Sequence, residues 1–108
     1  RAIELDQLNP EIYLQSAILL SQVGAISDAR KQLFARWQYA PQNPQFPYSL
    51  GLLVAESGDL TAAIGYLEET VALEPQFYRA WYNLSLAYQQ IGEPEKAERA
   101  MRRARGEP

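Results

Sequence analysis

The chain has no cysteine and no histidine among its 108 residues. Without cysteine there can be no disulfide and no thiol nucleophile, and without either residue type the classical zinc sites are excluded as well. Arrangements that pair a serine or a cysteine with a catalytic histidine are excluded for the same reason. These absences narrow the function, and the sequence predicts no metal site and no cofactor.

An excess of positive charge is also absent, since 10 Lys and Arg residues face 13 Asp and Glu residues and give a formal net charge of −3. A general nucleic-acid binder needs a basic surface that displaces counterions from phosphates. No apolar run approaches the roughly 18–20 residues that a membrane-spanning helix needs. Neither a nucleic acid nor a membrane is predicted as a partner. Hydrophobic residues make up 47% of the chain, which is enough for the core of one domain.

Glycine is scarce, with six in the chain, but three of them are evenly spaced. Gly24, Gly58 and Gly92 are separated by 34 residues each time (58 − 24 = 34 and 92 − 58 = 34). Small and apolar residues recur in phase at five, nine and seventeen residues after each glycine: Ala29, Ala63 and Ala97; Leu33, Leu67 and Met101; Pro41 and Pro75. A fixed period of this length is typical of a stacked array of repeated units.

Each unit has the pattern of a helix, a tight turn and a second helix. In the last unit, two apolar stripes at helical spacing flank the glycine; they are Ala80, Trp81, Leu84, Ala87 and Tyr88, then Ala97, Ala100, Met101 and Ala104. Gly92 is predicted to close the first helix in the left-handed conformation. Glu93 is predicted to cap the second helix, with Pro94 in its first position. Asp59 is predicted to be the corresponding cap one unit earlier.

A second type of helix start is predicted between units, where Asn43 is followed by Pro44. This pair is typical of a cap and a proline in the first turn. Pro47 then stands where an intrahelical N–H is first needed, so the sequence predicts a late or irregular start for this helix.

These residues resemble the tetratricopeptide repeat, a helix–turn–helix unit with the pattern W-x2-L-G-x2-Y…A-x3-F…A-x4-P. Three units match it in phase: Tyr13, Ala17, Gly24, Ala29, Leu33 and Pro41; then Leu50, Gly51, Gly58, Ala63, Leu67 and Pro75; then Trp81, Leu84, Tyr88, Gly92, Ala97, Met101 and Ala104. The first unit departs from the pattern at Ser16, Leu20 and Arg36, and the other two units depart at four positions. Pro47 replaces the aromatic residue, Val54 the tyrosine and Thr70 the last alanine, and Ser85 replaces the glycine.

The resemblance implies an all-α fold, a right-handed superhelical array of antiparallel helix pairs with about three repeats. The expected repeats are 9–42, 43–76 and 77–108, and residues 1–8 match the end of the second helix of a preceding repeat. We therefore expect the chain to be the C-terminal part of a longer protein. The last helix has Glu98 and Arg105 where the unit before it has Ile64 and Val71. This polar character predicts a capping repeat, with the array ending near residue 108.

In this family the first helices of successive repeats line a concave groove that holds peptides or protein segments. By resemblance, the groove residues here are Leu14, Ile18, Tyr48, Ser49, Leu52, Arg79, Tyr82, Asn83 and Leu86. An aromatic and aliphatic floor with amide edges suits an extended or helical apolar segment. For Ile18, Leu52 and Leu86, packing between neighbouring helices is an equally good interpretation. Arg79 alone offers a cation, which argues against a clamp for a C-terminal carboxylate.

Other side chains have competing interpretations. Five cations make the last helix basic and could bind phosphate or an acidic partner; they are Lys96, Arg99, Arg102, Arg103 and Arg105. A solvated outer face, paired at helical spacing with Glu95 and Glu98, is the favoured interpretation. Glu68 and Glu69 point in different directions on a helix and are interpreted as surface residues. Five aromatic residues are predicted to fill the seams between repeats: Trp37, Tyr39, Phe46, Phe77 and Tyr78.

The predicted function is non-catalytic binding of a protein or peptide segment, from a partner or from the parent chain. Two alternatives belong to other classes. The array could assemble with itself, as a homodimer through the exposed N-terminal edge, or it could be an accessory domain of a larger enzyme or cofactor protein. Nothing in the sequence names the partner.

Overall fold

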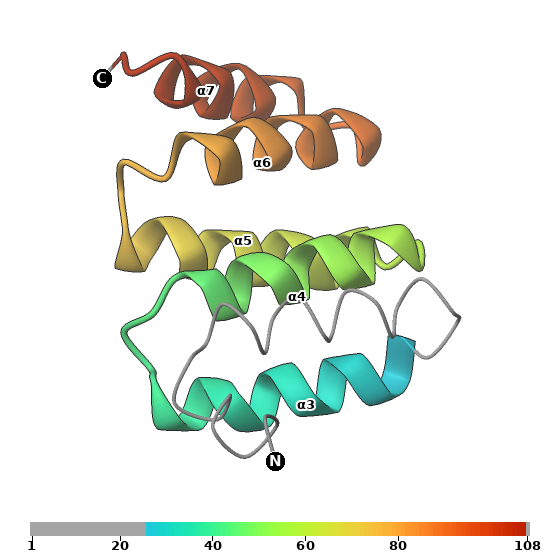
Figure 1. Cartoon of the computed structure of the whole chain (residues 1–108). Helices are drawn as coiled ribbons and strands as arrows, with labels where there is room; N and C mark the ends of the chain where they lie inside the picture. The colour runs from blue at the N-terminus through green and yellow to red at the C-terminus, as the bar shows by residue number, and fades with distance from the viewer. Residues whose placement is uncertain (1–25, 108) are drawn as a thin grey trace.

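The computed structural model describes residues 26–107, and within them the chain forms five α-helices and no strand. The helices are α3 (Ile26–Tyr39), α4 (Gln45–Glu56), α5 (Leu60–Leu73), α6 (Tyr78–Gln90) and α7 (Pro94–Ala104). Each packs on the helix that follows it in the chain. Figure 1 shows the hairpins α4–α5 and α6–α7 stacked above α3. The predicted all-α array of antiparallel helix pairs is confirmed over these residues.

The expected repeat 43–76 contains α4 and α5, and the expected repeat 77–108 contains α6 and α7. Of the expected repeat 9–42, the structure describes the second helix, α3. The remaining predictions for the N-terminal part fall outside the described residues. These are the end of a preceding repeat at 1–8, the turn at Gly24, and the groove residues Leu14 and Ile18.

The two described inter-helix turns close in the same way. Gly58 and Gly92 have φ values of 94° and 82°, the left-handed conformation predicted for them. The N–H of Asp59 donates to the carbonyl of Val54 at 2.9 Å, and one period later Glu93 N donates to the carbonyl of Tyr88 at 2.8 Å. Residues at equivalent positions of the two repeats therefore adopt the same backbone conformation in these turns.

The starts of the two second helices differ in their caps. Asp59 caps α5 as predicted, because its Oδ1 accepts a hydrogen bond from Ala62 N at 3.1 Å. Glu93 makes no side-chain cap bond, so the prediction for its side chain is wrong. The backbone carbonyl of Glu93 accepts the first intrahelical bond, from Ala97 N at 3.0 Å, as the carbonyl of Asp59 does from Ala63 N at 3.0 Å. Pro94 lies in the first turn as predicted, where its missing N–H costs nothing.

Helix α4 starts one residue after Pro44, in line with the late start predicted from Pro47. Helix α4 begins at Gln45, and Pro47 is its third residue. The first four N–H groups of an α-helix have no intrahelical acceptor, so a proline at this position removes no bond. Asn43 provides the capping interaction, because its Oδ1 accepts from Gln45 N at 3.0 Å. Pro47 is itself fully buried and fills space in the core.

Apolar side chains between the helices form two core clusters, one centred on α3 and α4 and one on α4 to α7. Of the predicted seam aromatics, Phe46 is buried and Trp37 and Phe77 pack against the clusters. The other two are exposed, Tyr39 by 79% and Tyr78 by 48%, so the prediction is wrong for them. Both lie at the end of a helix, Tyr39 as the last residue of α3 and Tyr78 as the first of α6.

Close helix crossings depend on small residues at matched positions. A Cβ atom on Gly51 would meet Leu67 Cγ at 3.0 Å and the carbonyl oxygen of Ala63 at 3.3 Å. One period later Ser85 is fully buried, and its hydroxyl donates to the carbonyl of Ala97 at 2.9 Å. Ser85, which replaces the glycine of the family pattern, thus donates a hydrogen bond to the carbonyl of Ala97 on the facing helix.

Candidate functional site

One face of α6 presents the predicted groove residues of the last repeat. Arg79, Tyr82, Asn83 and Leu86 lie at helical spacing of three and four residues, which places them on one side of the helix. Tyr82 is 48% exposed and Leu86 is 36% exposed. Large apolar side chains therefore reach solvent on this face. With Leu52 of α4, these residues are called the groove face below.

Asn83 is held in place by two hydrogen bonds from its amide nitrogen. Its Nδ2 donates to the hydroxyl oxygen of Tyr48 at 3.2 Å and to the backbone carbonyl of Arg79 at 3.0 Å. Tyr48 belongs to α4, and its ring lies 4.6 Å from that of Phe77, centroid to centroid. Burial raises the pKa of the Tyr48 phenol. The amide of Asn83 is therefore supported from within the core.

A hollow of about 180 Å³ lies between α4, α5 and α6 beside these residues. It is lined by Leu52, Ala55, Leu60, Ala63, Leu67, Asn83, Leu86, Ala87 and Gln90. Leu60 was not predicted to line this face, because it belongs to a second helix. Its position in the first turn of α5, directly after the inter-helix turn, brings it back toward the groove. The hollow joins Leu52, Asn83 and Leu86 into one continuous surface.

The structure brings five of the nine predicted groove residues together on this accessible face: Leu52, Arg79, Tyr82, Asn83 and Leu86. It places Tyr48 and Ser49 in the interior, with 8% and 7% of their surface exposed. Leu14 and Ile18 lie outside the described residues. Tyr48 is connected to the groove face only through its hydrogen bond with Asn83. The repeat pattern does not show how deeply the side chains of Tyr48 and Ser49 are buried.

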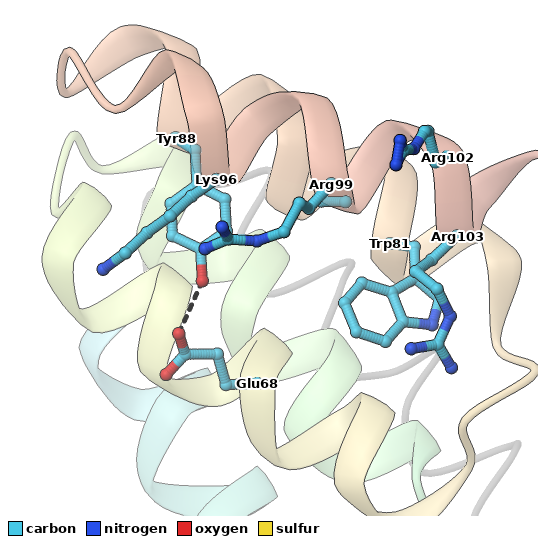
Figure 2. A pocket seen from close by; sticks show the side chains of 8 residues that line it. Glu68, Trp81, Tyr88, Lys96, Arg99, Arg102 and Arg103 are labelled. Carbon is cyan, nitrogen blue, oxygen red and sulfur yellow. Dashed lines mark hydrogen bonds between the residues drawn. The ribbon is translucent and has the colours of Figure 1, made fainter. Parts of the chain in front are cut away.

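A second, larger pocket of about 380 Å³ lies between α5, α6 and α7. Figure 2 shows its side chains, and we call it the basic pocket; it is lined by Glu68, Trp81, Tyr88, Lys96, Arg99, Ala100, Arg102 and Arg103. Trp81 and Tyr88 lie about 150° and about 170° around α6 from the centre of the groove face, at about 100° per residue. The two surfaces therefore occupy opposite sides of the same helix.

Cations and aromatic rings are matched in the basic pocket. The guanidinium carbon of Arg103 lies 4.6 Å from the centroid of Trp81, and Lys96 Nζ lies 5.9 Å from that of Tyr88. The Tyr88 hydroxyl donates to Glu68 Oε2 at 2.6 Å. Burial, and then the bond to the Glu68 carboxylate, raises the pKa of Tyr88. Glu68 is thus a hydrogen-bond partner between repeats and not only a surface residue.

The favoured interpretation of the basic helix as a solvated face is confirmed for Lys96, Arg99, Arg102 and Arg105, which are exposed, but its predicted pairing with the acids of the same helix is wrong. Among residues 26–107, neither Glu95 nor Glu98 forms an ion pair with its cations, and Arg105 pairs with Glu107 at 3.0 Å. The physical reason for the missing ion pairs is the direction in which the cations of α7 point. Lys96, Arg99 and Arg103 lie three and four residues apart and face α5 and α6, where aromatic rings compete for them.

The part of the chain that the structure describes holds no group of three acidic, cysteine or histidine side chains that could bind a metal. None of its helices is long and apolar enough to cross a membrane.

Two tetratricopeptide repeat models match the sequence, one at residues 14–75 and the other at residues 54–107. The chain belongs to the tetratricopeptide repeat family. Such repeats are generally protein-interaction modules without catalytic activity.

Two curated proteins are similar to the chain. The chain is 27% identical over 100 residues to the human protein O-mannosyl-transferase TMTC3, covering 90% of this chain and 11% of that protein. It is 32% identical over 53 residues to an uncharacterized protein of Methanocaldococcus jannaschii, covering 49% of this chain and 62% of that protein. The chain thus spans less than two thirds of either relative.

Solved structures share the fold. A crystal structure of MamA matches with a TM-score of 0.81 at 26% identity, covering 97% of this chain and 61% of that chain. An O-GlcNAc transferase of Thermobaculum terrenum matches with a TM-score of 0.77 at 26% identity, covering 92% and 19%. The Yersinia enterocolitica translocator chaperone SycD matches with a TM-score of 0.81 at 24% identity, covering 90% and 74%. The last of these shows the fold alone.

Proposed function

We propose that the chain is a non-catalytic binding module that holds a peptide or protein segment on its groove face. The observation that supports this most directly is the exposure of Tyr82 and Leu86 on one stripe of α6, next to an apolar hollow. Exposed aromatic and aliphatic side chains grouped in this way are typical of interaction surfaces.

The chemistry of this face favours a partner segment with apolar side chains. Leu52, Tyr82 and Leu86 supply apolar contact area, and the hollow of about 180 Å³ accepts one or two small apolar groups. Asn83 is fixed by Tyr48, so its amide is pre-organised to bond the backbone of the segment with little loss of rotamer entropy. Arg79 adds one cation at the rim. The segment can belong to a partner or to the parent chain.

The test compares two substitutions on opposite sides of α6–α7. Peptides selected from a random library on the wild-type chain are titrated against Tyr82→Ala and Arg102→Ala. We expect Tyr82→Ala to weaken binding by about 30-fold, which corresponds to about 2 kcal/mol for a central aromatic residue. Arg102→Ala, in the basic pocket, is the control and changes the affinity little. Equal losses, or a larger loss for Arg102→Ala, contradict the proposal.

A role as an accessory module of a longer protein is supported by the lengths of the relatives. The two relatives whose names include a transferase, TMTC3 and the Thermobaculum terrenum protein, are matched over 11% and 19% of their length. We propose that repeats 43–76 and 77–108 serve such a protein by holding a segment rather than by chemistry. Self-association through the N-terminal edge stays a prediction, because that edge falls within residues 1–25.

A further inference from the structure

We propose that the basic pocket is a second binding site, and that it takes an acidic peptide segment whose carboxylates contact Lys96, Arg99, Arg102 and Arg103. This site does not depend on the groove face, because the two lie on opposite sides of α6. The proposal is based on the repeat itself, on the geometry of the cations and on the charge balance.

The repeat supplies an internal comparison for the four cations. One period earlier, the positions equivalent to Lys96, Arg99, Arg102 and Arg103 are Ala62, Gly65, Glu68 and Glu69. The positions equivalent to Trp81 and Tyr88 are Pro47 and Val54. The preceding helix pair therefore packs with neither cations nor aromatic rings at these positions. Since the fold does not require them, the basic pocket is a feature of the last repeat alone among the two described hairpins.

The aromatic floor of the pocket is fixed by hydrogen bonds. Trp81 Nε1 donates to the carbonyl of Pro75 at 2.8 Å, and Tyr88 donates to Glu68 at 2.6 Å. These rings in turn orient the cations above them. Figure 2 shows Lys96 and Arg99 extending beside Tyr88, and Arg103 beside Trp81. Cations that are already placed on a rigid floor lose less conformational entropy when they bind an anion.

The local charge is opposite to that of the chain. Four cations and one carboxylate line the pocket, a balance of +3, whereas the whole chain has a net charge of −3. The carboxylate, Glu68, already accepts the Tyr88 hydroxyl. An arriving carboxylate therefore meets a positive field in a recessed site, where arginine can form two parallel hydrogen bonds to it.

The spacing of the cations favours a peptide over a single small anion. Lys96 and Arg103 are seven residues apart on α7, which is about 10 Å along a helix. One phosphate or one carboxylate cannot contact both ends of this row. An extended peptide rises about 3.3 Å per residue, so about three residues span it and alternate side chains point to the same side. Asp or Glu at such alternate positions matches the row.

The experiment measures binding of fluorescein-labelled octaglutamate to the 108-residue chain by anisotropy at low and at physiological salt, with octaglutamine as the neutral probe. We expect octaglutamate to bind and octaglutamine not to bind. Arg99→Gln and Lys96→Gln should each weaken octaglutamate binding about fivefold. Arg105→Gln is the matched control on the same helix and should change it about twofold or less, because Arg105 pairs with Glu107 outside the pocket. Circular dichroism melts establish that each variant is folded.

A substitution of opposite sign sharpens the test. Glu68→Gln keeps an oxygen that accepts the Tyr88 hydroxyl but removes a negative charge, so it should tighten octaglutamate binding, while Glu69→Gln, outside the lining, should not. Equal effects of Arg99→Gln and Arg105→Gln, or of Glu68→Gln and Glu69→Gln, overturn the proposal, because they reveal a response to net charge. Absence of octaglutamate binding, or tighter binding of an octathymidylate strand, overturns it as well. Tyr82→Ala should leave octaglutamate binding unchanged, which separates this site from the groove face.

Discussion

Ser85 and Gly51 occupy the same place in two successive helix pairs, 34 residues apart. The comparison shows how one crossing geometry admits two residue types. At Gly51, an added Cβ atom would lie only 3.0 Å from Cγ of the branched side chain of Leu67. At Ser85 the residue equivalent to Leu67 is Met101, which is unbranched and adapts its shape. The choice at one position is therefore coupled to the choice on the facing helix.

This coupling gives a prediction about stability. Gly51→Ser should destabilise the fold by about 1–3 kcal/mol, because the added atoms overpack against Leu67. Leu67→Met in the same chain should recover most of that loss, by reproducing the pair found one period later. Urea unfolding of the two single variants and of the double variant measures the interaction between the sites. Simple addition of the two single effects in the double variant contradicts the coupling.

Tyr88 gives a second prediction at the scale of a residue, on the dependence of stability on pH. Its pKa is raised above the ordinary value of 10.0 by burial and by the Glu68 carboxylate. Below pH 10 the phenol is protonated in both the folded and the unfolded chain, and the stabilisation is complete. As the pH rises above about 10, the unfolded chain loses the proton more readily, so the free energy of unfolding falls.

Tyr88→Phe should remove this part of the pH dependence. Near neutral pH the variant should be less stable by about 1 kcal/mol, the contribution of a hydrogen bond to a charged group on a partly exposed site. Between pH 10 and pH 11 the difference from the wild type should shrink. Denaturant unfolding at a series of pH values gives both quantities. Tyr82→Phe, on the groove face, is the control, and an equal narrowing in that variant would refute the assignment to Tyr88.

At the scale of the helices, two glycines differ in whether the backbone requires a glycine: one lies in a turn that ends a helix, and the other lies within a helix. Gly92 has a φ of 82° with nothing within 4 Å of its missing Cβ, so only its backbone conformation disfavours a side chain. Gly65, within α5, also has nothing within 4 Å, and its backbone is helical. A methyl group would fit at both positions, so substitutions there differ only in the effect of the backbone conformation.

Gly92→Ala should therefore destabilise the chain by about 1 kcal/mol or more, since a left-handed conformation strains an L-residue. Gly65→Ala should stabilise it by about 0.5–1 kcal/mol, because glycine within a helix costs that much relative to alanine. Thermal and urea unfolding of both variants make the comparison. A stabilised Gly92→Ala variant would show that the turn can close without the left-handed residue.

The elements were predictable where one residue decides the geometry. The 34-residue spacing, Gly58, Gly92 and the Asp59 cap were enough to place the turns of two hairpins. Pro47 is compatible with α4 because the helix begins at Gln45, one residue after Pro44, so the missing N–H of Pro47 is among the four that have no intrahelical acceptor. A shift of one residue in a helix start decides whether a proline there removes a hydrogen bond, and a sequence pattern does not fix a helix start that closely.

The candidate site was predictable in part, for a different reason. The repeat pattern identifies columns of residues, so it correctly grouped Arg79, Tyr82, Asn83 and Leu86 on one face of α6. It does not give the depth of a side chain, and Tyr48 lies in the core although Tyr82 in the same column is exposed. The cations of α7 were identified in the sequence, but the pocket that they form with α5 and α6 was not predicted, because its contacts join three helices.

At the scale of the whole molecule, the two surfaces on either side of α6 differ in chemistry. The groove face combines apolar side chains with one supported amide, and the basic pocket combines cations with two fixed aromatic rings. A segment suited to one surface is poorly suited to the other. If both proposals hold, the last repeat contacts two segments at once, and one longer ligand that wraps around the end of the array would gain from both.

The helices pack on their neighbours in the chain, α3 on α4, α4 on α5, α5 on α6 and α6 on α7. Contacts between residues close in sequence need little loop closure before they form, and chains with this topology are fast folders, on the microsecond to millisecond scale. A hairpin of this array can also nucleate by itself and recruit the next one. During synthesis on the ribosome, each new hairpin therefore finds the surface on which it packs already made.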